Sequence, residues 1–294
     1  MLDDWCRAVG PAVVLEPSLS RATPRLDEIA LISWNVDVGG GDLDALLEWL
    51  RDDRQMDRPI VLLLQEAYRA GELIPPVAGP HHVPHRIEHA PPSGQRRSVI
   101  DVARARHLSL AYVPSMRNGS EGIPEDRGNA ILSNLRLHDL EAIELPFEHQ
   151  RRVAIAATVS VLDADGRIVP LRVVSAHLDA RATWKHGLFF WSGRRRQADA
   201  LVGQIDRERG ATIVGGDFNS WLGGLEPEVR HLRRDFPQTP SAHTRVTFPV
   251  LGAAGFHLDH LFFRLRGGWH AEVVRVGERR GSDHYPLLAT FRSG

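Results

Sequence analysis

The stretch Thr212-Ile213-Val214-Gly215-Gly216-Asp217-Phe218-Asn219-Ser220 decides the fold. Ile213 and Val214 predict a buried strand, and the two glycines after them leave room for close approach of a ligand or of a second backbone. Asp217 and Asn219 are two residues apart, so on an extended chain their side chains point the same way. The stretch therefore presents a carboxylate and a carboxamide together at a strand end. An ordinary turn has the same composition, so the rest of the chain decides between these interpretations.

Two apolar runs near the N-terminus also finish in polar residues. Ile29 to Trp34 predicts a buried strand that ends at Asn35, and Ile60 to Leu64 predicts a second that ends at Gln65-Glu66. Between them, Asp42 is suited to cap a helix whose leucines fall on one face. The first unit is therefore strand, helix, strand, with polar groups at both strand ends.

The later strands repeat this pattern. The predicted strand Leu171 to Ala176 ends at His177, the strand His257 to Phe263 carries Asp259, and the turn Gly281 to His284 leads into a last strand. If these strands share one end, their polar groups converge on one cleft, the usual place for a site in layered α/β proteins. The pattern predicts an α/β fold of two mixed β-sheets packed together and flanked by helices. We expect one domain over 28–294, preceded by an arm over 1–27.

Composition excludes several classes of protein. The 294 residues are 43% hydrophobic and 25% charged, which is ordinary for a globular chain, and the net charge of −1 gives no general attraction for nucleic acid. Cys6 is the only cysteine, so no internal disulfide is possible. No stretch approaches the length of a membrane span, and the start of the chain lacks the features of a signal peptide. We therefore expect a cytoplasmic location, and nothing in the sequence implies a stable protein partner.

The polar groups at the strand ends are carboxylates, carboxamides and two histidines, without a thiolate. Hard oxygen ligands suit Mg²⁺ or Mn²⁺ better than zinc. A hard cation among amides and histidines is what phosphoryl chemistry requires, because the metal ion neutralises phosphate oxygens while a base activates water. The chain has no glycine-rich nucleotide loop of the P-loop type. Hydrolysis of a phosphoester is therefore favoured over the use of a nucleoside triphosphate.

With these residues in view, the chain resembles the endonuclease/exonuclease/phosphatase superfamily, which has the deoxyribonuclease-I-like fold. Seven short motifs carry the resemblance, in the family's order and over residues 29–291. They are Ser33-Trp34-Asn35-Val36, Leu64-Gln65-Glu66, Arg127-Gly128-Asn129, Ser175-Ala176-His177-Leu178, Gly216-Asp217-Phe218-Asn219, Leu258-Asp259-His260 and Ser282-Asp283-His284. The resemblance implies a four-layered α/β/β/α sandwich with a divalent-metal phosphodiesterase or phosphatase site at one edge.

The resemblance also implies a metal site. Glu66 matches the family's metal-binding glutamate, Asn35 lies beside it, and Asp283 matches a second acidic residue near the metal ion. The implied cofactor is Mg²⁺ or Mn²⁺.

The remaining matched residues imply the catalytic groups. His284 matches the histidine next to the scissile phosphate, with Asp259 as its orienting carboxylate. Asp217 and Asn219 match the pair that positions the water and a phosphate oxygen, and His177 matches a second histidine that donates to phosphate. Either His284 or Asp217 could be the base, and the sequence does not choose between them.

Three further residues are assigned to the substrate, and two long segments of the chain are interpreted separately. Tyr112, Arg127 and Asn129 are matched to the substrate phosphate, although Asn129 could instead pin the Arg127 loop. The Pro- and His-rich stretch 71–95 reads as a long surface loop rather than a metal site, because its histidines are irregularly spaced. The aromatic and basic residues of 181–193 are expected to cover the cleft.

The predicted activity is therefore metal-dependent hydrolysis of a phosphodiester, with nucleic acid, DNA or RNA, as the favoured substrate. A phospholipid or inositol-phosphate substrate, as in sphingomyelinases, uses the same core residues and is the alternative. A catalytically silent member that binds a phosphorylated partner is a third hypothesis, which the completeness of the motifs disfavours.

Overall fold

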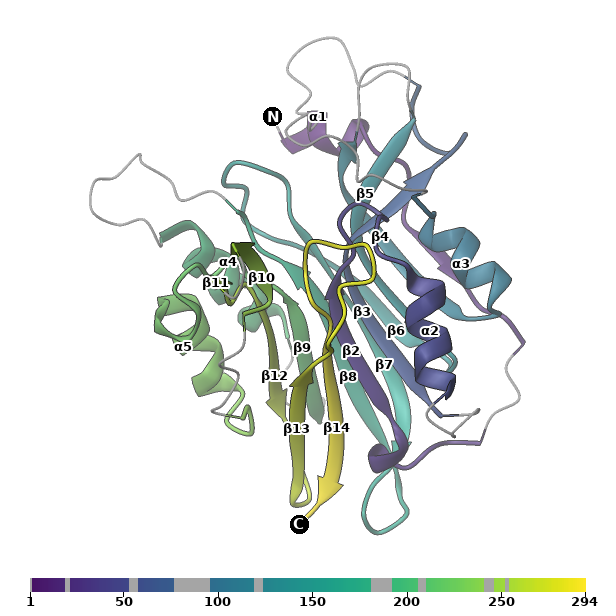
Figure 1. Ribbon diagram of the computed structural model, residues 1–294, viewed down its shortest axis with the longest axis vertical. Helices are drawn as coiled ribbons and strands as arrows, with labels where there is room; N and C mark the ends of the chain where they lie inside the picture. Colours follow the sequence, from purple (N-terminus) through teal and green to yellow (C-terminus); the bar gives the residue numbers. More distant parts are fainter. Residues whose placement is uncertain are drawn as a thin grey trace.

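The computed structural model describes residues 2–18, 22–52, 58–76, 96–118, 124–180, 192–205, 210–240, 246–251 and 254–294. These residues form two β-sheets packed face to face, with helices on both outer faces (Figure 1). The predicted α/β/β/α sandwich of two mixed sheets is thus confirmed. Most of the stretches 71–95 and 181–193 lies outside the described residues.

The larger sheet has seven strands, and β2 and β3 are its one parallel pair. The order across this sheet is β1 (Val13–Leu15), β4 (Ser109–Asn118), β5 (Glu125–Ser133), β3 (Ile60–Ala70), β2 (Ala30–Asn35), β14 (Leu287–Ser293) and β13 (Trp269–Arg275).

The smaller sheet has five strands, and β8 and β9 are its parallel pair. The order is β12 (Asp259–Arg264), β9 (Ala211–Asp217), β8 (Ile168–His177), β7 (Val153–Leu162) and β6 (His138–Glu144). A separate hairpin of β10 (Phe248–Leu251) and β11 (Ala254–Phe256) precedes β12.

Helices cover the outer face of each sheet. On the seven-stranded sheet, α2 (Leu43–Asp52) and α3 (Val99–Ala105) bury the leucines and valines that their helical spacing predicts. On the five-stranded sheet, α4 (Ser192–Gln204) and α5 (Pro227–Asp235) pack against the other side (Figure 1). Within the described residues, no helix is long and apolar enough to cross a membrane.

The core between the two sheets is apolar along most of its length. Near one end the sheets come very close, since a Cβ on Gly215 would lie 2.8 Å from side-chain atoms of Leu63 and Leu261. A Cβ on Gly216 would lie 1.9 Å from the carbonyl oxygen of Ala176 on the neighbouring strand. Of the two uses that the sequence left open for these glycines, close approach of other parts of this chain is therefore the one observed.

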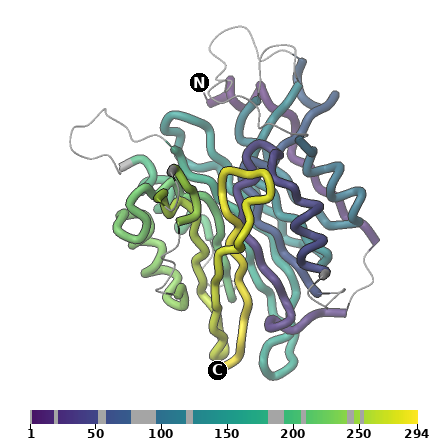
Figure 2. Tube along the Cα trace, viewed as in Figure 1, coloured from purple at the N-terminus to yellow at the C-terminus, as the bar shows by residue number. Residues whose placement is uncertain are grey.

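The N-terminal residues pack closely on the sandwich. Helix α1 (Leu2–Arg7) buries Trp5, whose ring meets the ring of Phe147 with centroids 5.8 Å apart, and β1 adds to the edge of the larger sheet. The Gly10 N–H donates to Asp126 Oδ2 at 2.9 Å, inside the protein. Helix α1 and the end of β14 lie at opposite ends of the molecule (Figure 2). The division into an arm over 1–27 and a single domain over 28–294 stays a prediction.

Candidate active site

A pocket of about 380 Å³ opens where both sheets end. Most of the polar residues that the sequence places at strand ends line it. They are Asn35, Glu66, His177, Asp217, Asn219, Asp283 and His284. Asp259 stands directly behind His284.

Sheet register brings three of these groups together. Asp217 at the end of β9 is paired with His177 on one side and with Asp259 on the other. Paired residues on adjacent strands project to the same face. This face is the one that packs against the larger sheet, so all three side chains project into the gap between the sheets.

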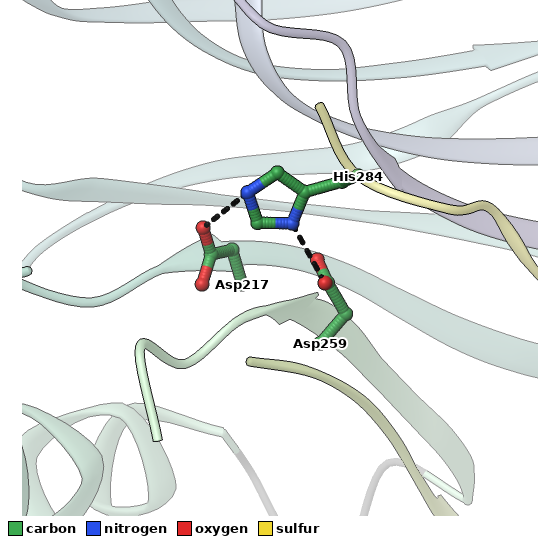
Figure 3. Close-up of side chains that lie close together, drawn as sticks. All are labelled: Asp217, Asp259 and His284. Atoms are coloured by element: carbon green, nitrogen blue, oxygen red, sulfur yellow. Dashed lines mark hydrogen bonds and ion pairs between the residues drawn. The ribbon is translucent and has the colours of Figure 1, made fainter. Parts of the chain in front are cut away.

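His284 lies between two carboxylates (Figure 3). Its Nδ1 is 2.7 Å from Asp259 Oδ2, and its Nε2 is 3.8 Å from Asp217 Oδ2. Burial acts to lower the pKa of His284, but Asp259 and then Asp217 outweigh it and raise the pKa to about 10. The imidazole is therefore protonated at neutral pH, and it presents an N–H toward the pocket.

Asp217 is buried and held on both oxygens. Asn35 Nδ2 donates to Oδ2 and the Asn219 N–H donates to Oδ1, each at 2.9 Å. Burial raises the pKa of Asp217 to about 7, against the lowering effect of His284 and these two donors. A carboxylate with this pKa is suited to accept a proton near neutral pH.

Asn219 connects Asp217 with His177. Its φ of 50° lies in the left-handed region, which asparagine tolerates better than most residues. Its Nδ2 lies 3.0 Å from the Leu178 carbonyl oxygen and 3.1 Å from His177 Nε2. The sequence motif around Asp217 thus fixes the neighbouring histidine as well as the carboxylate.

Hydrogen bonds through Ser282 and Trp34 fix the position of His284 relative to β2. Ser282 Oγ donates to the Asn35 carbonyl oxygen at 2.6 Å and accepts the His284 N–H at 3.0 Å. Trp34 Nε1 donates to the His284 carbonyl oxygen at 3.1 Å. These contacts explain why the motifs around Asn35 and Asp283 converge although about 250 residues separate them.

Glu66 reaches the pocket through a β-bulge. The sequence predicts that the strand ends at Glu66, but β3 continues to Ala70, and its pairing with β5 shifts between Leu64 and Ala67. At the bulge Glu66 has a φ of 52°, which re-aims its side chain. Its Oε2 accepts a hydrogen bond from Arg127 Nη1 at 2.7 Å. The apolar run Ile60 to Leu64 is thus followed by a bulge within β3, and the strand does not end there.

Asp37 is a pocket residue that the sequence interpretation missed. Burial, followed by the charges of Asp283 and Glu66, raises the pKa of Asp37 to about 6. Three carboxylates therefore crowd one side of the pocket. The available signal was an acid two residues after the polar strand end at Asn35, but a left-handed turn at Asp37, with a φ of 46°, is not readable from that spacing.

Five further lining residues were also missed. They are Gln150, Arg152, Trp221, Phe248 and Phe256. Arg152 is buried, and its Nη2 donates to Gln150 Oε1 at 2.9 Å. Among the described lining residues Arg152 is the one arginine, and no lysine is present. Arg152 directly precedes β7, and nothing in the sequence around it indicates that it reaches the pocket.

The three residues matched to the substrate phosphate are absent from the described lining. Tyr112 is fully buried, and its hydroxyl donates to Asp126 Oδ1 at 2.7 Å. Asn129 Nδ2 donates to the Val153 carbonyl oxygen at 2.6 Å, which joins the two sheets. Arg127 donates a hydrogen bond to the Glu66 carboxylate. The structure gives these residues internal partners and brings none of them to the pocket surface.

Two sets of residues could hold a metal ion. The ligand atoms of Asp217, Asp259 and His284 all lie within 4.8 Å of one another. However, a protonated imidazole has no lone pair to offer a cation. The carboxylates of Asp37, Glu66 and Asp283 repel one another, and a cation would relieve this repulsion. Their oxygen chemistry fits a hard divalent ion.

A protein-family model matches most of this chain. The model of the Endonuclease/Exonuclease/phosphatase family matches residues 32–284. A UPF0294 protein of Yersinia pseudotuberculosis is 31% identical over 145 residues, which are 48% of this chain and 50% of that protein. The chain thus spans about half the length of the curated relatives it matches.

Solved structures share the fold. An endonuclease/exonuclease/phosphatase from Beutenbergia cavernae is similar with a TM-score of 0.60 and 16% identity, over 90% of this chain and 71% of that one. The human nocturnin catalytic domain with bound sulfate anion is similar with a TM-score of 0.55 and 18% identity, over 92% of this chain and 96% of that one. At these identities the likeness concerns the fold alone.

Proposed function

Because this chain belongs to the endonuclease/exonuclease/phosphatase family, we propose that it is a divalent-metal-dependent hydrolase of phosphodiesters, with nucleic acid as the substrate. The observation that carries the proposal is the position of His284. Its ring is held at Nδ1 by Asp259, and its Nε2 faces Asp217 in the pocket. A buried acid–histidine pair beside a second, separately held carboxylate is suited to proton transfer around a bound phosphoester.

Glu66, Asp283 and Asn35 would hold the metal ion, with Asp37 close enough to contribute negative charge. Bound Mg²⁺ or Mn²⁺ supplies charge neutralisation at the phosphate oxygens. Arg127 orients Glu66 by donating to Oε2, and Asn35 is oriented by the Asp37 N–H, which donates to Oδ1 at 3.1 Å. Both residues are therefore positioned before any ligand arrives.

The protons are handled by this chain's own side chains. We propose that Asp217 accepts the proton of the attacking water, because its pKa of about 7 lies near neutral pH. His284, with a pKa of about 10, donates its Nε2–H to a phosphate oxygen. His177 and Asn219 would hold a further oxygen by exchanging their mutual contact for the substrate, and Arg152 adds positive charge to the lining. These assignments choose between the two bases that the sequence left open.

Charge balance favours a diester over a monoester. The described lining carries the carboxylates of Asp37, Glu66, Asp217 and Asp283, which outnumber its two cations, Arg152 and the protonated His284. A diester carries one negative charge at neutral pH and a monoester close to two. The diester therefore meets less repulsion from the pocket.

Hydrolysis assays on the purified protein test the proposal. We expect bis(p-nitrophenyl) phosphate and single-stranded DNA to be cleaved with Mg²⁺ or Mn²⁺, and cleavage to stop with a chelator. Asp217→Asn should lower kcat at least about a hundredfold, because an amide cannot accept the proton. A matched control is Asp101→Asn on α3, at an exposed position outside the pocket. Activity that survives chelation, or equal activity of wild type and Asp217→Asn, would contradict the proposal.

A further inference from the structure

Two groups of pocket residues, one acidic and one aromatic, come from different elements of the fold. The acidic side belongs to the loops and strand ends of the seven-stranded sheet, with Glu66 on β3 and Asp283 before β14. The other side carries Trp221, Phe248 and Phe256, from segments that follow β9 and precede β12. We call these three residues the aromatic wall. The proposed metal binding uses the acidic side, and the proposed proton transfer uses Asp217 at the end of β9 together with His284. The aromatic wall is left without a role.

The aromatic wall starts at the reacting histidine. The rings of Phe248 and His284 have centroids 5.0 Å apart. Trp221 and Phe256 meet edge to face, with centroids 4.8 Å apart and an interplanar angle of 64°. A group packed on this wall would therefore lie close to a phosphate that contacts His284.

The turn that carries Trp221 is held firmly. Ser220 Oγ donates to the His257 carbonyl oxygen at 2.7 Å and lies 2.6 Å from His260 Nε2. The Leu222 N–H donates to Glu226 Oε1 at 3.0 Å. Trp221 is nevertheless 48% exposed. A large aromatic ring fixed in place with half its surface uncovered, at the edge of a pocket, is arranged for contact with a ligand.

We propose that the aromatic wall binds the nucleobase next to the scissile phosphate, with Trp221 as the stacking residue. The inference rests on the proposed phosphodiester hydrolysis and names the group that the site recognises beyond the phosphate. A base presents a flat π-face that stacks on aromatic side chains whichever base it is. A pocket of about 380 Å³ is of the size that holds one nucleotide unit.

A lipid is the competing occupant. Leu222 and Leu225 are exposed just beyond Trp221 and would meet acyl chains. These leucines do not line the pocket, whereas the side that reaches His284 is aromatic among the described residues. Flat aromatic side chains next to the phosphate favour a base, and the experiment includes the lipid as an outcome.

Two diesters with the same p-nitrophenyl leaving group test the proposal. One is the p-nitrophenyl ester of thymidine 5′-monophosphate, and the other is ethyl p-nitrophenyl phosphate, which lacks a base. Trp221→Ala should lower kcat/KM on the thymidine ester about tenfold, the equivalent of one stacking contact. The same variant should lower kcat/KM on the ethyl ester far less, because that ester has no base to stack on Trp221. Trp221→Phe should keep most of the preference for the thymidine ester, because it retains an aromatic face.

A matched control and a binding measurement complete the test. Trp49 on α2 is exposed but lies outside the described lining. Trp49→Ala should therefore leave kcat/KM on both esters unchanged. Isothermal titration should show that Trp221→Ala binds thymidine 5′-monophosphate more weakly than the wild type does. The affinity for inorganic phosphate should be the same in the two proteins. This measurement requires no turnover. It therefore tests whether the aromatic wall binds a base even if the wild type hydrolyses neither ester. The absence of hydrolysis would by itself reject the proposed function.

Other outcomes overturn the inference. Equal losses on the two esters would mean that Trp221 supports the pocket and does not recognise a base. Hydrolysis of phosphatidylcholine vesicles that falls in Trp221→Ala and Leu225→Ala, with the thymidine ester unaffected, would assign this surface to a lipid.

Discussion

At the scale of single residues, the site depends on side chains that are held before a ligand binds. Asp217 receives two hydrogen bonds from its own neighbours, and Glu66 receives one from Arg127. Such contacts favour the charged carboxylate and restrict its rotamer. Each of these residues therefore has a geometry that a substitution would change in a defined way.

The first prediction concerns Glu66. Glu66→Gln should keep the fold, because the amide oxygen can still accept from Arg127, but it should bind Mg²⁺ poorly because the amide is neutral. We expect the Mg²⁺ concentration for half-maximal activity to rise at least about tenfold. Glu48→Gln, at an exposed position on α2, is the control. Full activity of Glu66→Gln at limiting Mg²⁺ would reject the metal assignment.

Residues that follow apolar runs or lie in the seven family motifs could be predicted from the sequence, whereas Arg152 and Trp221 could not. Asn35, His177 and Asp217 follow directly on buried strands, so their convergence was readable from the pattern of the chain. Arg152 and Trp221 reach the pocket from loops whose conformation depends on distant contacts, such as the bond from Ser220 to His257. No local periodicity records such contacts.

At the scale of secondary-structure elements, apolar runs predict where strands lie but not how they end. The run Ile60 to Leu64 is a strand as predicted, and yet the strand continues past Glu66 through a bulge. Pairing with β5 supplies the hydrogen bonds for this extension, and those partners lie about sixty residues away in the sequence. The bulge aims Glu66 at the pocket, so the error in the predicted boundary falls on a residue of the proposed metal site.

Helices α4 and α5 are joined by a buried charge cluster. Arg194 contacts Glu226 through Nη2 at 2.5 Å and Glu228 through Nε at 3.1 Å. Burial, and then Glu226, raise the pKa of Glu228 to about 8. Burial also acts to raise the pKa of Glu226, but hydrogen bonds from Glu228 and the Leu222 N–H lower it. The two carboxyl groups thus share a proton at neutral pH.

The second prediction follows from this shared proton. Between the ordinary glutamate pKa of 4.5 and about 8, the folded protein holds a proton at Glu228 that the unfolded chain releases. The free energy of unfolding therefore falls as pH rises through this window. Glu228→Gln is neutral at every pH, so its unfolding free energy should fall less. Urea denaturation at pH values within and above the window measures the difference. Parallel curves for the two proteins would show that Glu228 carries no such proton.

At the scale of the whole molecule, the site exists because two sheets end at the same place. His284 comes from the loop before β14 of the larger sheet, and Asp259 begins β12 of the smaller one. Asn129 Nδ2 joins the sheets nearby through the Val153 carbonyl oxygen. The layered fold was predictable from alternating strands and helices, whereas the close fit of the sheets at Gly215 depends on packing between distant residues.

The central claim is that His284 and Asp259 act as one unit across the two sheets. An imidazole that must hold one orientation and carry charge depends on the carboxylate at its other nitrogen. A double-mutant cycle on kcat for a phosphodiester tests this dependence most directly. His284→Ala and Asp259→Ala should each lower kcat by roughly a thousandfold or more, and the double variant should lose little beyond the worse single one. Losses that multiply fully in the double variant would show that the two residues act independently, and they would contradict the account.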